Sequence, residues 1–231
     1  LRNDNNQAGY YNLIYDNGGY IINDDKTKSG MDDPKTVEAM EMLEGWIKDG
    51  VLPPIETMSE NGEDVLLESG KVAMVPQGSW MIAAFRDNEY TAENCDCVEL
   101  PKSATTGRRA SLYNGLGWAA AANTEHPEEA WQLIEYLGSK EAQEKQAELG
   151  VTMSAYTGTS EAWAKSADFN LQAYINMMDD MEIRPYSRST VTWENKNSEI
   201  LKSVYSGDKT MADACKEMAE QMNESLAEEQ Q

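Results

Sequence analysis

The sequence predicts an α/β protein in which helices predominate. Short apolar runs of strand length alternate with longer segments whose apolar residues recur every three or four positions, which is the spacing of one helix face. The chain has 231 residues, of which 40% are hydrophobic and 26% charged, a composition typical of folded proteins. This length is sufficient for one large domain or two small ones.

A helix and a short strand are predicted first. The helix carries one apolar stripe and ends at "DNGG", residues 16–19. The segment "GGYIIND", residues 18–24, has the length of a strand and leads into a polar turn. The stripe of the helix consists of Tyr10, Tyr11, Ile14 and Tyr15.

The clearest helix signal covers residues 32–50. Asp33 is a suitable N-cap, Pro34 occupies the favoured first position, and Gly50 provides the end. We expect one side of this helix to be buried, because its apolar residues follow helical spacing. These residues are Val37, Met40, Leu43 and Ile47.

The next segment predicts a helix, a strand and a second helix. Residues 60–70 form the first helix, which leads into the strand "KVAMV", residues 71–75. After Pro76 and a glycine, Ser79 can cap a new helix that has Trp80 in its first turn. A tryptophan at such a junction cannot be buried as thoroughly as one in the middle of a strand.

Two further strands and a helix pair follow. The strands are "CDCVELP", residues 95–101, and the apolar run "GWAAAAN", residues 117–123. Residues 126–150 then predict two helices that are divided at Gly138.

The last third of the chain, from Ser160 onward, is predicted to be mainly helical. Only the tail "AEEQQ", residues 227–231, has a disordered composition. The methionines of the final helix are expected to fill a core, because Met packs readily into irregular space. The buried stripes are Ile200, Leu201, Val204 and Tyr205, then Met211, Cys215, Met218 and Met222.

Composition excludes several classes of partner. The formal net charge of −22 repels phosphate backbones and anionic lipid headgroups, so we expect no nucleic acid and no membrane surface as a partner. No run approaches the about 20 apolar residues that span a bilayer, so this segment is not expected to insert into a membrane. The opening "LRNDNNQAGYYN" lacks the apolar stretch of a signal peptide.

Signals for catalysis, cofactors and metals are weak. His126, the one histidine, precedes Pro127 at a helix start, and no G-x-S-x-G turn supports a triad. The 41 acidic residues make close carboxylate pairs inevitable by chance. Residues 115–120, "GLGWAA", match a degenerate dinucleotide fingerprint but precede a strand-like run, whereas the motif must follow a strand. No metal or organic cofactor is therefore expected.

The three cysteines do not form a recognised pattern. Cys95 and Cys97 are separated by one residue, which is neither a redox nor a zinc spacing. An odd number of cysteines also implies no disulfide framework. Cys95 and Cys97 are interpreted as small apolar residues of one strand face.

Aromatic residues at the ends of elements point to a sugar site. Trp80 begins a helix, Tyr113 lies in a polar loop, and Trp193 precedes a later helix. Sugars present apolar C–H faces ringed by hydroxyl groups, so their sites need flat aromatic rings with amide and hydroxyl partners. The stretches "QGSW" and "LYNG" offer both. Each ring could equally cover the edge of a core.

Five motifs in order resemble the C-terminal part of an extracellular solute-binding protein of the family 1 type. These proteins are the carbohydrate receptors of ABC importers and are related to maltose-binding protein. The motifs are "DNGGY" (16–20), "DDPKTVEAMEMLEGWIKDGVLPP" (32–54), "GKVAMVPQGSW" (70–80), "NGLGWAAAANTEHPEEAWQLIEYLGSKEAQEKQAELG" (114–150) and "SVYSGDKTMADACKEMAEQMNESL" (203–226).

The resemblance implies a periplasmic-binding-protein-like (type II) fold, in which two α/β lobes joined by crossing strands trap the ligand between them. The first lobe begins upstream in this family, so it would be largely absent from this chain. Residues 1–103 and 158–231 would form the second lobe. Residues 104–157 would cross the hinge and complete the first lobe.

The resemblance also implies ligand-binding residues. Trp80 matches a cleft tryptophan that stacks on a sugar ring, and Ser79 lies beside it at the helix N-terminus. Trp193 matches a second aromatic platform. Tyr113 and Asn114 fall where the strand crosses the hinge. Tyr10 and Tyr15 lie on the helix that lines the cleft, although either could belong to the core.

The function implied is capture of a sugar or oligosaccharide, without catalysis, for delivery to ABC permease subunits. The location implied is outside the cytoplasmic membrane, either lipid-anchored or periplasmic, with signal and anchor upstream. Three alternatives remain open. These are a glycan-processing hydrolase that uses a carboxylate pair, a helical interaction module without a small ligand, and a receptor for another solute such as a polyamine or peptide.

Overall fold

The computed structural model describes residues 6–230, apart from the side chains of Ile55, Glu56 and Ser59. The chain divides into two compact units. Unit 1 contains the residues up to Pro76, the stretch Leu100–Tyr113, and the residues from Asp180 onward. Unit 2 contains Gln77–Glu99 and Asn114–Asp179.

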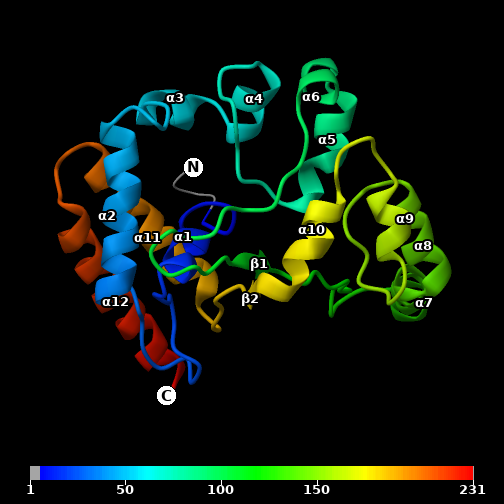
Figure 1. Ribbon diagram of the computed structural model, residues 1–231. Coiled ribbons are helices and arrows are strands. Elements are labelled where there is room, and N and C mark those ends of the chain that lie inside the picture. Colours follow the sequence, from blue (N-terminus) through cyan, green and yellow to red (C-terminus); the bar gives the residue numbers. More distant parts are fainter. Residues whose placement is uncertain (1–5, 231) are drawn as a thin grey trace. The chain divides into compact units, whose positions relative to one another are not determined.

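Unit 1 is helical with one small sheet (Figure 1). Its described elements are α1 (Tyr10–Asp16), α2 (Pro34–Lys48), α3 (Ile55–Glu60), α4 (Glu63–Glu68), β1 (Ser111–Tyr113), β2 (Met181–Ile183), α11 (Thr190–Tyr205) and α12 (Met211–Glu229).

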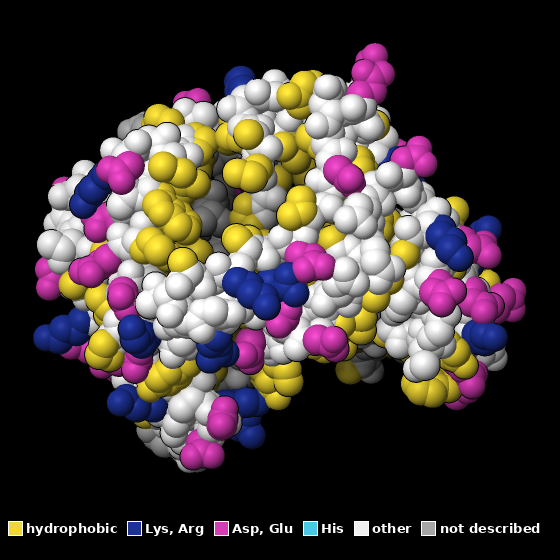
Figure 2. All heavy atoms as spheres, viewed as in Figure 1, with side chains coloured by type: hydrophobic (Ala, Val, Ile, Leu, Met, Phe, Trp, Pro, Cys, Tyr) yellow, Lys and Arg dark blue, Asp and Glu magenta, His cyan; other side chains and the backbone are white. Residues whose placement is uncertain are grey.

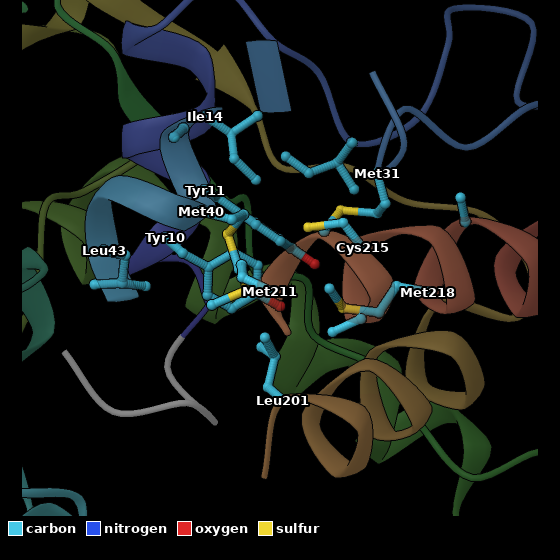
Figure 3. Packing of buried hydrophobic residues seen from close by; sticks show 14 of the residues in the cluster. Tyr10, Tyr11, Ile14, Met31, Met40, Leu43, Leu201, Met211, Cys215 and Met218 are labelled. Carbon is cyan, nitrogen blue, oxygen red and sulfur yellow. The ribbon is translucent and has the colours of Figure 1, made fainter. Parts of the chain in front are cut away.

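The core of unit 1 lies where α1, α2, α11 and α12 pack together. Figure 3 shows the methionine and cysteine side chains of this core meeting the aromatic and aliphatic ones. The sulfur-rich stripe of α12 is buried, which confirms the prediction that it fills a core. Its residues Met211, Cys215, Met218 and Met222 are each at most 1% exposed.

Helix α2 begins and packs as the sequence predicts. Asp33 caps it by accepting a hydrogen bond from the Lys35 amide at 2.9 Å, and Pro34 is its first residue. Met40 and Leu43 are buried in the core, whereas Val37 and Ile47 are only half-buried. The helix therefore buries a narrower stripe than its spacing suggests.

The sheet of unit 1 is a short parallel pair. Ser111 pairs with Met181 and Tyr113 with Ile183. Asp16, the last residue of α1, accepts a hydrogen bond from the Ala110 amide at 2.6 Å. Ion pairs join the approach to β1 to the β2 region, Arg109 to Asp180 at 2.6 Å and Arg108 to Glu182 at 3.1 Å. Side chains as well as the ladder thus hold the two strands in register.

The C-terminal tail is helical through Glu229, so the prediction of disorder from residue 227 is wrong for the described part of the tail. The reason is a contact that is distant in sequence. The Glu229 carboxylate accepts hydrogen bonds from the Arg188 amide at 3.0 Å and the Ser189 amide at 2.7 Å. It also accepts from the hydroxyls of Ser187 and Ser189. These groups precede α11, so Glu229 ties the end of α12 to the start of α11.

Unit 2 is a second helical unit with its own core (Figure 1). Ile82, Ala147, Trp163 and Leu171 form its buried centre. Its elements are η1 (Ser79–Met81), α5 (Ile82–Asp87), α6 (Glu89–Asn94), α7 (Pro127–Gly138), α8 (Lys140–Glu148), α9 (Ser160–Ala164), α10 (Gln172–Asn176) and most of η2 (Met177–Asp180).

Each unit combines segments that the sequence analysis assigned to different lobes. Residues 77–99 and 158–179 pack with 114–157, whereas 104–113 pack with unit 1. The core of unit 2 joins three of these segments, because it draws Ile82 from 77–99, Ala147 from 114–157, and Trp163 from 158–179. Apolar side chains from all three segments leave water only by packing together.

Four predicted strands do not form ladders. Within residues 6–230, the segment 18–24 has a single bridge, from Ile22 to Ser29, and residues 71–75, 95–101 and 117–123 are irregular. Side chains make some of the backbone hydrogen bonds instead. For example, the Asp96 carboxylate accepts from the Cys97 amide at 2.7 Å, and the Asn170 side chain donates to the Cys97 carbonyl at 3.3 Å. A strand needs a partner, which spacing along the sequence cannot supply.

The surface carries both signs of charge. Figure 2 shows acidic side chains spread over the face in view, with Lys and Arg side chains among them. The acidic side chains on that face therefore do not gather in one patch. None of the described helices is long and apolar enough to cross a membrane.

Candidate functional site

Trp80 lies where an irregular segment becomes a helix. Residues Ser79–Met81 form the single turn η1, and α5 begins at Ile82. Ile82 is fully buried in the core of unit 2 and anchors this junction, whereas Trp80 remains 47% exposed. The tryptophan at this position thus presents a large part of its ring to solvent, unlike Trp163 of the same unit, which is 0% exposed.

Gly78 makes the position of the Trp80 ring possible. A Cβ on Gly78 would lie 2.0 Å from Cζ3 and 2.2 Å from Cη2 of Trp80. The six-membered ring therefore occupies the space that any other side chain at position 78 would fill. The backbone of Gly78 has φ −88°, an ordinary value, so close approach explains the glycine here and backbone conformation does not.

Hydrogen bonds hold the residues on both sides of Gly78. The carbonyl of Gln77 accepts from the Tyr174 hydroxyl at 3.1 Å, and the Gln77 side chain accepts from the Gly78 amide at 3.0 Å. The Ser79 hydroxyl lies 3.2 Å from that of Thr152. Ser79 is therefore engaged across the unit and does not cap the helix, which corrects the predicted cap; the capping position belongs to Gly78.

Asn114 belongs to unit 2 and is exposed. It opens a stretch, residues 114–123, that is exposed throughout. Its predicted neighbour Tyr113 is the last residue of β1, in unit 1, and is 51% exposed. The Tyr113 carbonyl accepts from the Arg184 amide at 2.9 Å, which fixes its backbone while the ring stays accessible.

Trp193 and Tyr10 lie in the core of unit 1. Trp193 is 0% exposed and donates from Nε1 to the Ser187 hydroxyl at 3.0 Å. Helix α11 begins at Thr190, before Trp193, so this residue falls on the inward face of the helix and does not precede it as predicted. Tyr10 is 2% exposed and packs edge to face on Tyr11, with centroids 4.9 Å apart. Neither ring has an open face in unit 1, so neither enters the proposal below.

Tyr15 is half-buried at the end of α1. Burial, followed by the charges of Glu182 and Asp24, raises the pKa of its hydroxyl to about 12. The hydroxyl is therefore protonated at neutral pH and remains a hydrogen-bond donor. Tyr15 thus combines a partly accessible ring with a polar group.

Sequence reasoning missed a polar cluster in unit 1. Arg184 Nη2 donates to both carboxylate oxygens of Glu194, at 2.8 and 2.7 Å, and the Tyr11 hydroxyl donates to the same carboxylate at 3.2 Å. Burial, followed by the neighbouring Tyr10 and Glu194 groups, raises the pKa of Tyr11 well above its ordinary value. No spacing in the sequence marks this cluster, because Tyr11 and Glu194 are 183 positions apart.

The predicted residues thus separate into two groups. Trp80, Ser79 and Asn114 belong to unit 2, and Tyr10, Tyr15, Tyr113 and Trp193 belong to unit 1. Sequence reasoning also missed Thr152 and Tyr174, which support the Trp80 junction through Ser79 and Gln77. In the sequence, only Gly78 of "QGSW", two positions before Trp80, indicates a close contact at this junction.

Solved structures identify the fold. The GacH receptor of Streptomyces glaucescens, solved with and without acarbose, superposes with a TM-score of 0.84 at 18% identity, over 98% of this chain and 58% of the receptor. An ABC substrate-binding protein from Listeria monocytogenes, in complex with cycloalternan, gives a TM-score of 0.81 at 18% identity, over 94% of this chain and 56% of that protein.

An ABC transporter solute-binding protein from Thermotoga lettingae, bound with α-D-tagatose, gives a TM-score of 0.80 at 22% identity, over 96% of this chain and 57% of that protein. The chain thus has the helix-rich, periplasmic-binding-protein-like α/β fold of ABC solute-binding proteins, as predicted. It spans little more than half the length of each of these three proteins.

A family comparison gives the same class. The model of the family described as bacterial extracellular solute-binding protein matches residues 3–179. This chain belongs to that family, which is a family of solute-binding proteins. None of the curated proteins matches the chain.

Proposed function

We propose that this chain is part of the solute-binding component of an ABC import system and binds a sugar or oligosaccharide. One observation of the chain itself carries the proposal. Trp80 presents a half-exposed indole ring that is packed against Gly78, and the hydroxyl of the preceding residue, Ser79, lies 3.2 Å from that of Thr152. An accessible flat ring suits a sugar, which has apolar faces and a polar rim.

The relatives support the same ligand class. The three proteins with similar folds described above were solved with acarbose, cycloalternan and tagatose, which are saccharides or close analogues. In unit 1, Tyr113 and Tyr15 supply accessible rings, and in unit 2 Asn114 supplies an exposed amide. We include each of these three residues in the proposal as a sugar-contacting residue of its own unit.

A second part of the proposal concerns residues 104–157, which we assign as the segment that crosses the hinge and completes the first lobe of a complete receptor; residues 104–113 pack with unit 1 and residues 114–157 with unit 2. Helix α7 supports this assignment, because none of its residues is buried. Trp131, Leu133 and Tyr136 are each more than half exposed. An apolar helix face normally packs against a core, so its exposure here is unusual. Figure 2 shows hydrophobic and acidic side chains at the surface over α7 and α8.

The proposed partners are ABC permease subunits, and the proposed location is the outer side of the cytoplasmic membrane. The family description supports an extracellular site of action. In this arrangement a lipid anchor or a periplasm would keep the receptor near its permease. The ligand would be released there unchanged, because a receptor of this kind performs no chemistry on it.

Intrinsic tryptophan fluorescence tests the proposal. We expect a saturable change when the chain is titrated with mono- and oligosaccharides up to tens of millimolar. Trp80→Ala should weaken binding by about tenfold or more, since a central aromatic contact carries much of the affinity. Trp131→Ala is the matched control, because Trp131 is 62% exposed on α7, away from the Trp80 junction in sequence.

The outcomes separate the alternatives. An unchanged affinity in Trp80→Ala would contradict the role given to Trp80. No response to any saccharide would contradict sugar binding by this chain, and a response to polyamines or peptides would redirect the ligand class. Release of nitrophenol from aryl glycosides would favour the hydrolase instead.

A further inference from the structure

The structure around Trp80 contains contacts that the proposed function leaves without a role. Gly78 leaves the space in which the indole ring lies. Tyr174, almost 100 positions later in the chain, donates from its hydroxyl to the Gln77 carbonyl at 3.1 Å. The Gly78 contact acts on the indole ring of Trp80, and the Tyr174 contact acts on the backbone that leads to it.

Tyr174 connects this backbone to the core of unit 2. Its ring packs edge to face on Trp163, with centroids 5.7 Å apart and planes at 85°. Trp163 is 0% exposed and belongs to the buried cluster with Ile82, Ala147 and Leu171. The position of the Tyr174 hydroxyl is therefore set by rigid neighbours, and through it the position of Gln77.

Tyr174 is a donor at neutral pH. Burial, with a smaller contribution from Cys97, raises the pKa of its hydroxyl above the ordinary value for tyrosine. A protonated hydroxyl can donate to the Gln77 carbonyl at neutral pH.

We propose that Gly78 and Tyr174 are positioning residues that hold the indole ring of Trp80 in one orientation before ligand arrives. Tyr174 does so by fixing the Gln77 backbone, and Gly78 by leaving room for the ring. The proposal rests on the proposed function for the identity of the ligand, but the orientation of the ring is a property of the chain alone. A ring that is already placed loses less conformational freedom on binding, which increases affinity.

Two substitutions separate the contributions of Gly78 and Tyr174 and leave Trp80 itself unsubstituted. Gly78→Ala adds a methyl group where the ring now lies, with a backbone conformation that alanine tolerates. Tyr174→Phe removes the hydroxyl and keeps the ring that packs on Trp163. Matched controls are Gly138→Ala, whose Cβ would meet nothing within 4 Å, and Tyr90→Phe, at a tyrosine that is 43% exposed on α6.

The first readout is free of ligand. The chain is labelled with 5-fluorotryptophan, and the ¹⁹F resonance of Trp80 is assigned by its loss in Trp80→Phe. We expect Gly78→Ala and Tyr174→Phe each to shift or broaden the Trp80 resonance, and both controls to leave it in place. If the Trp80 resonance keeps its wild-type position in both variants, the positioning role is refuted whatever the protein binds.

The second readout is saccharide affinity. If the wild-type chain binds a sugar, we expect Gly78→Ala to raise Kd by about tenfold and Tyr174→Phe by about fivefold, with both controls unchanged. Wild-type affinity in Gly78→Ala would overturn the proposal. A shifted Trp80 resonance in a chain that binds no saccharide would support positioning and refute the proposed function.

A general loss of structure is detected separately. The midpoint of urea unfolding and the other five tryptophan resonances report on the fold, and Trp163 is expected to move only in Tyr174→Phe. If Gly78→Ala fails to fold, Tyr174→Phe alone decides: a shifted Trp80 resonance at a near-normal urea midpoint supports the positioning role, and an unshifted one refutes it.

Discussion

Replacing Asp16 by Asn is expected to stabilise unit 1 at neutral pH. Asp16 ends α1 and accepts a hydrogen bond from the Ala110 amide at 2.6 Å, at the start of the segment that leads into β1. Partial burial raises the pKa of its carboxyl from 3.8 to about 6, although the Ala110 amide, Arg108 and Arg109 act in the opposite direction. An amide oxygen can accept the same bond without carrying a charge.

The sign and size of this stability change follow from the pKa of Asp16 in the unfolded and in the folded chain. The folded chain binds the Asp16 proton more tightly than the unfolded chain, so this group contributes stability below about pH 4 that is lost as pH rises through about 6. The difference between 3.8 and about 6 corresponds to about 3 kcal/mol. Because the carboxyl is partly exposed to water, we expect about 1–2 kcal/mol.

Urea unfolding at pH 7.5 and at pH 5 measures the difference in stability between Asp16→Asn and wild type. Both pH values lie above the isoelectric point near 4.3. Asp16→Asn should be about 1 kcal/mol more stable than wild type at pH 7.5, and the gap should shrink by about half at pH 5. Asp25→Asn, at an exposed aspartate of the neighbouring turn, is the control for the change in net charge. A variant that is less stable than wild type at pH 7.5 would refute the reasoning.

Three further predictions concern stability. Glu229→Gln should cost about 1 kcal/mol of stability at pH 7, and this cost should disappear as pH falls from about 4.5 toward 2. Partial desolvation opposes the charge of Glu229, but hydrogen bonds from the hydroxyls of Ser189 and Ser187 and from backbone amides lower its pKa to about 2. Urea unfolding of both chains at pH 7 and near pH 2 measures the cost, and a cost that does not change with pH would contradict the prediction. Trp193→Ala should cost about 3–5 kcal/mol in urea unfolding because the ring is fully buried, and a loss below about 1 kcal/mol would contradict its place in the core. Gly45→Ala, in the last turn of α2 with open space around the new methyl group, should raise the thermal midpoint through about 0.5–1 kcal/mol of helix stabilisation, and a lower midpoint would contradict this.

The buried helix pair of unit 1 shows how core packing and tail order depend on one another. Glu229 holds the segment before α11 through hydrogen bonds, and Ser187 of that segment accepts from the indole of Trp193. The end of the chain is thereby coupled to a core tryptophan. Composition of the tail could not indicate this, because the partners lie about 40 positions away.

The local features of the fold could be predicted from the sequence. The cap and first residue of α2, the division of α7 from α8 at Gly138, and the buried stripe of α12 depend on residues within a few positions of one another. Capping, propensity and helical spacing act over that range. The order of five motifs was also sufficient to indicate the family that the comparisons show.

Only the tertiary structure decided which aromatic residues remain accessible and which strands form. Trp80 and Trp193 had the same interpretation at the sequence level, yet one is 47% exposed over Gly78 and the other is 0% exposed on the inward face of α11. The bonds that set these outcomes, such as Tyr174 to Gln77 and Asp16 to Ala110, join residues more than 90 positions apart. Burial and strand pairing depend on such distant partners, and a local pattern carries no information about where they lie.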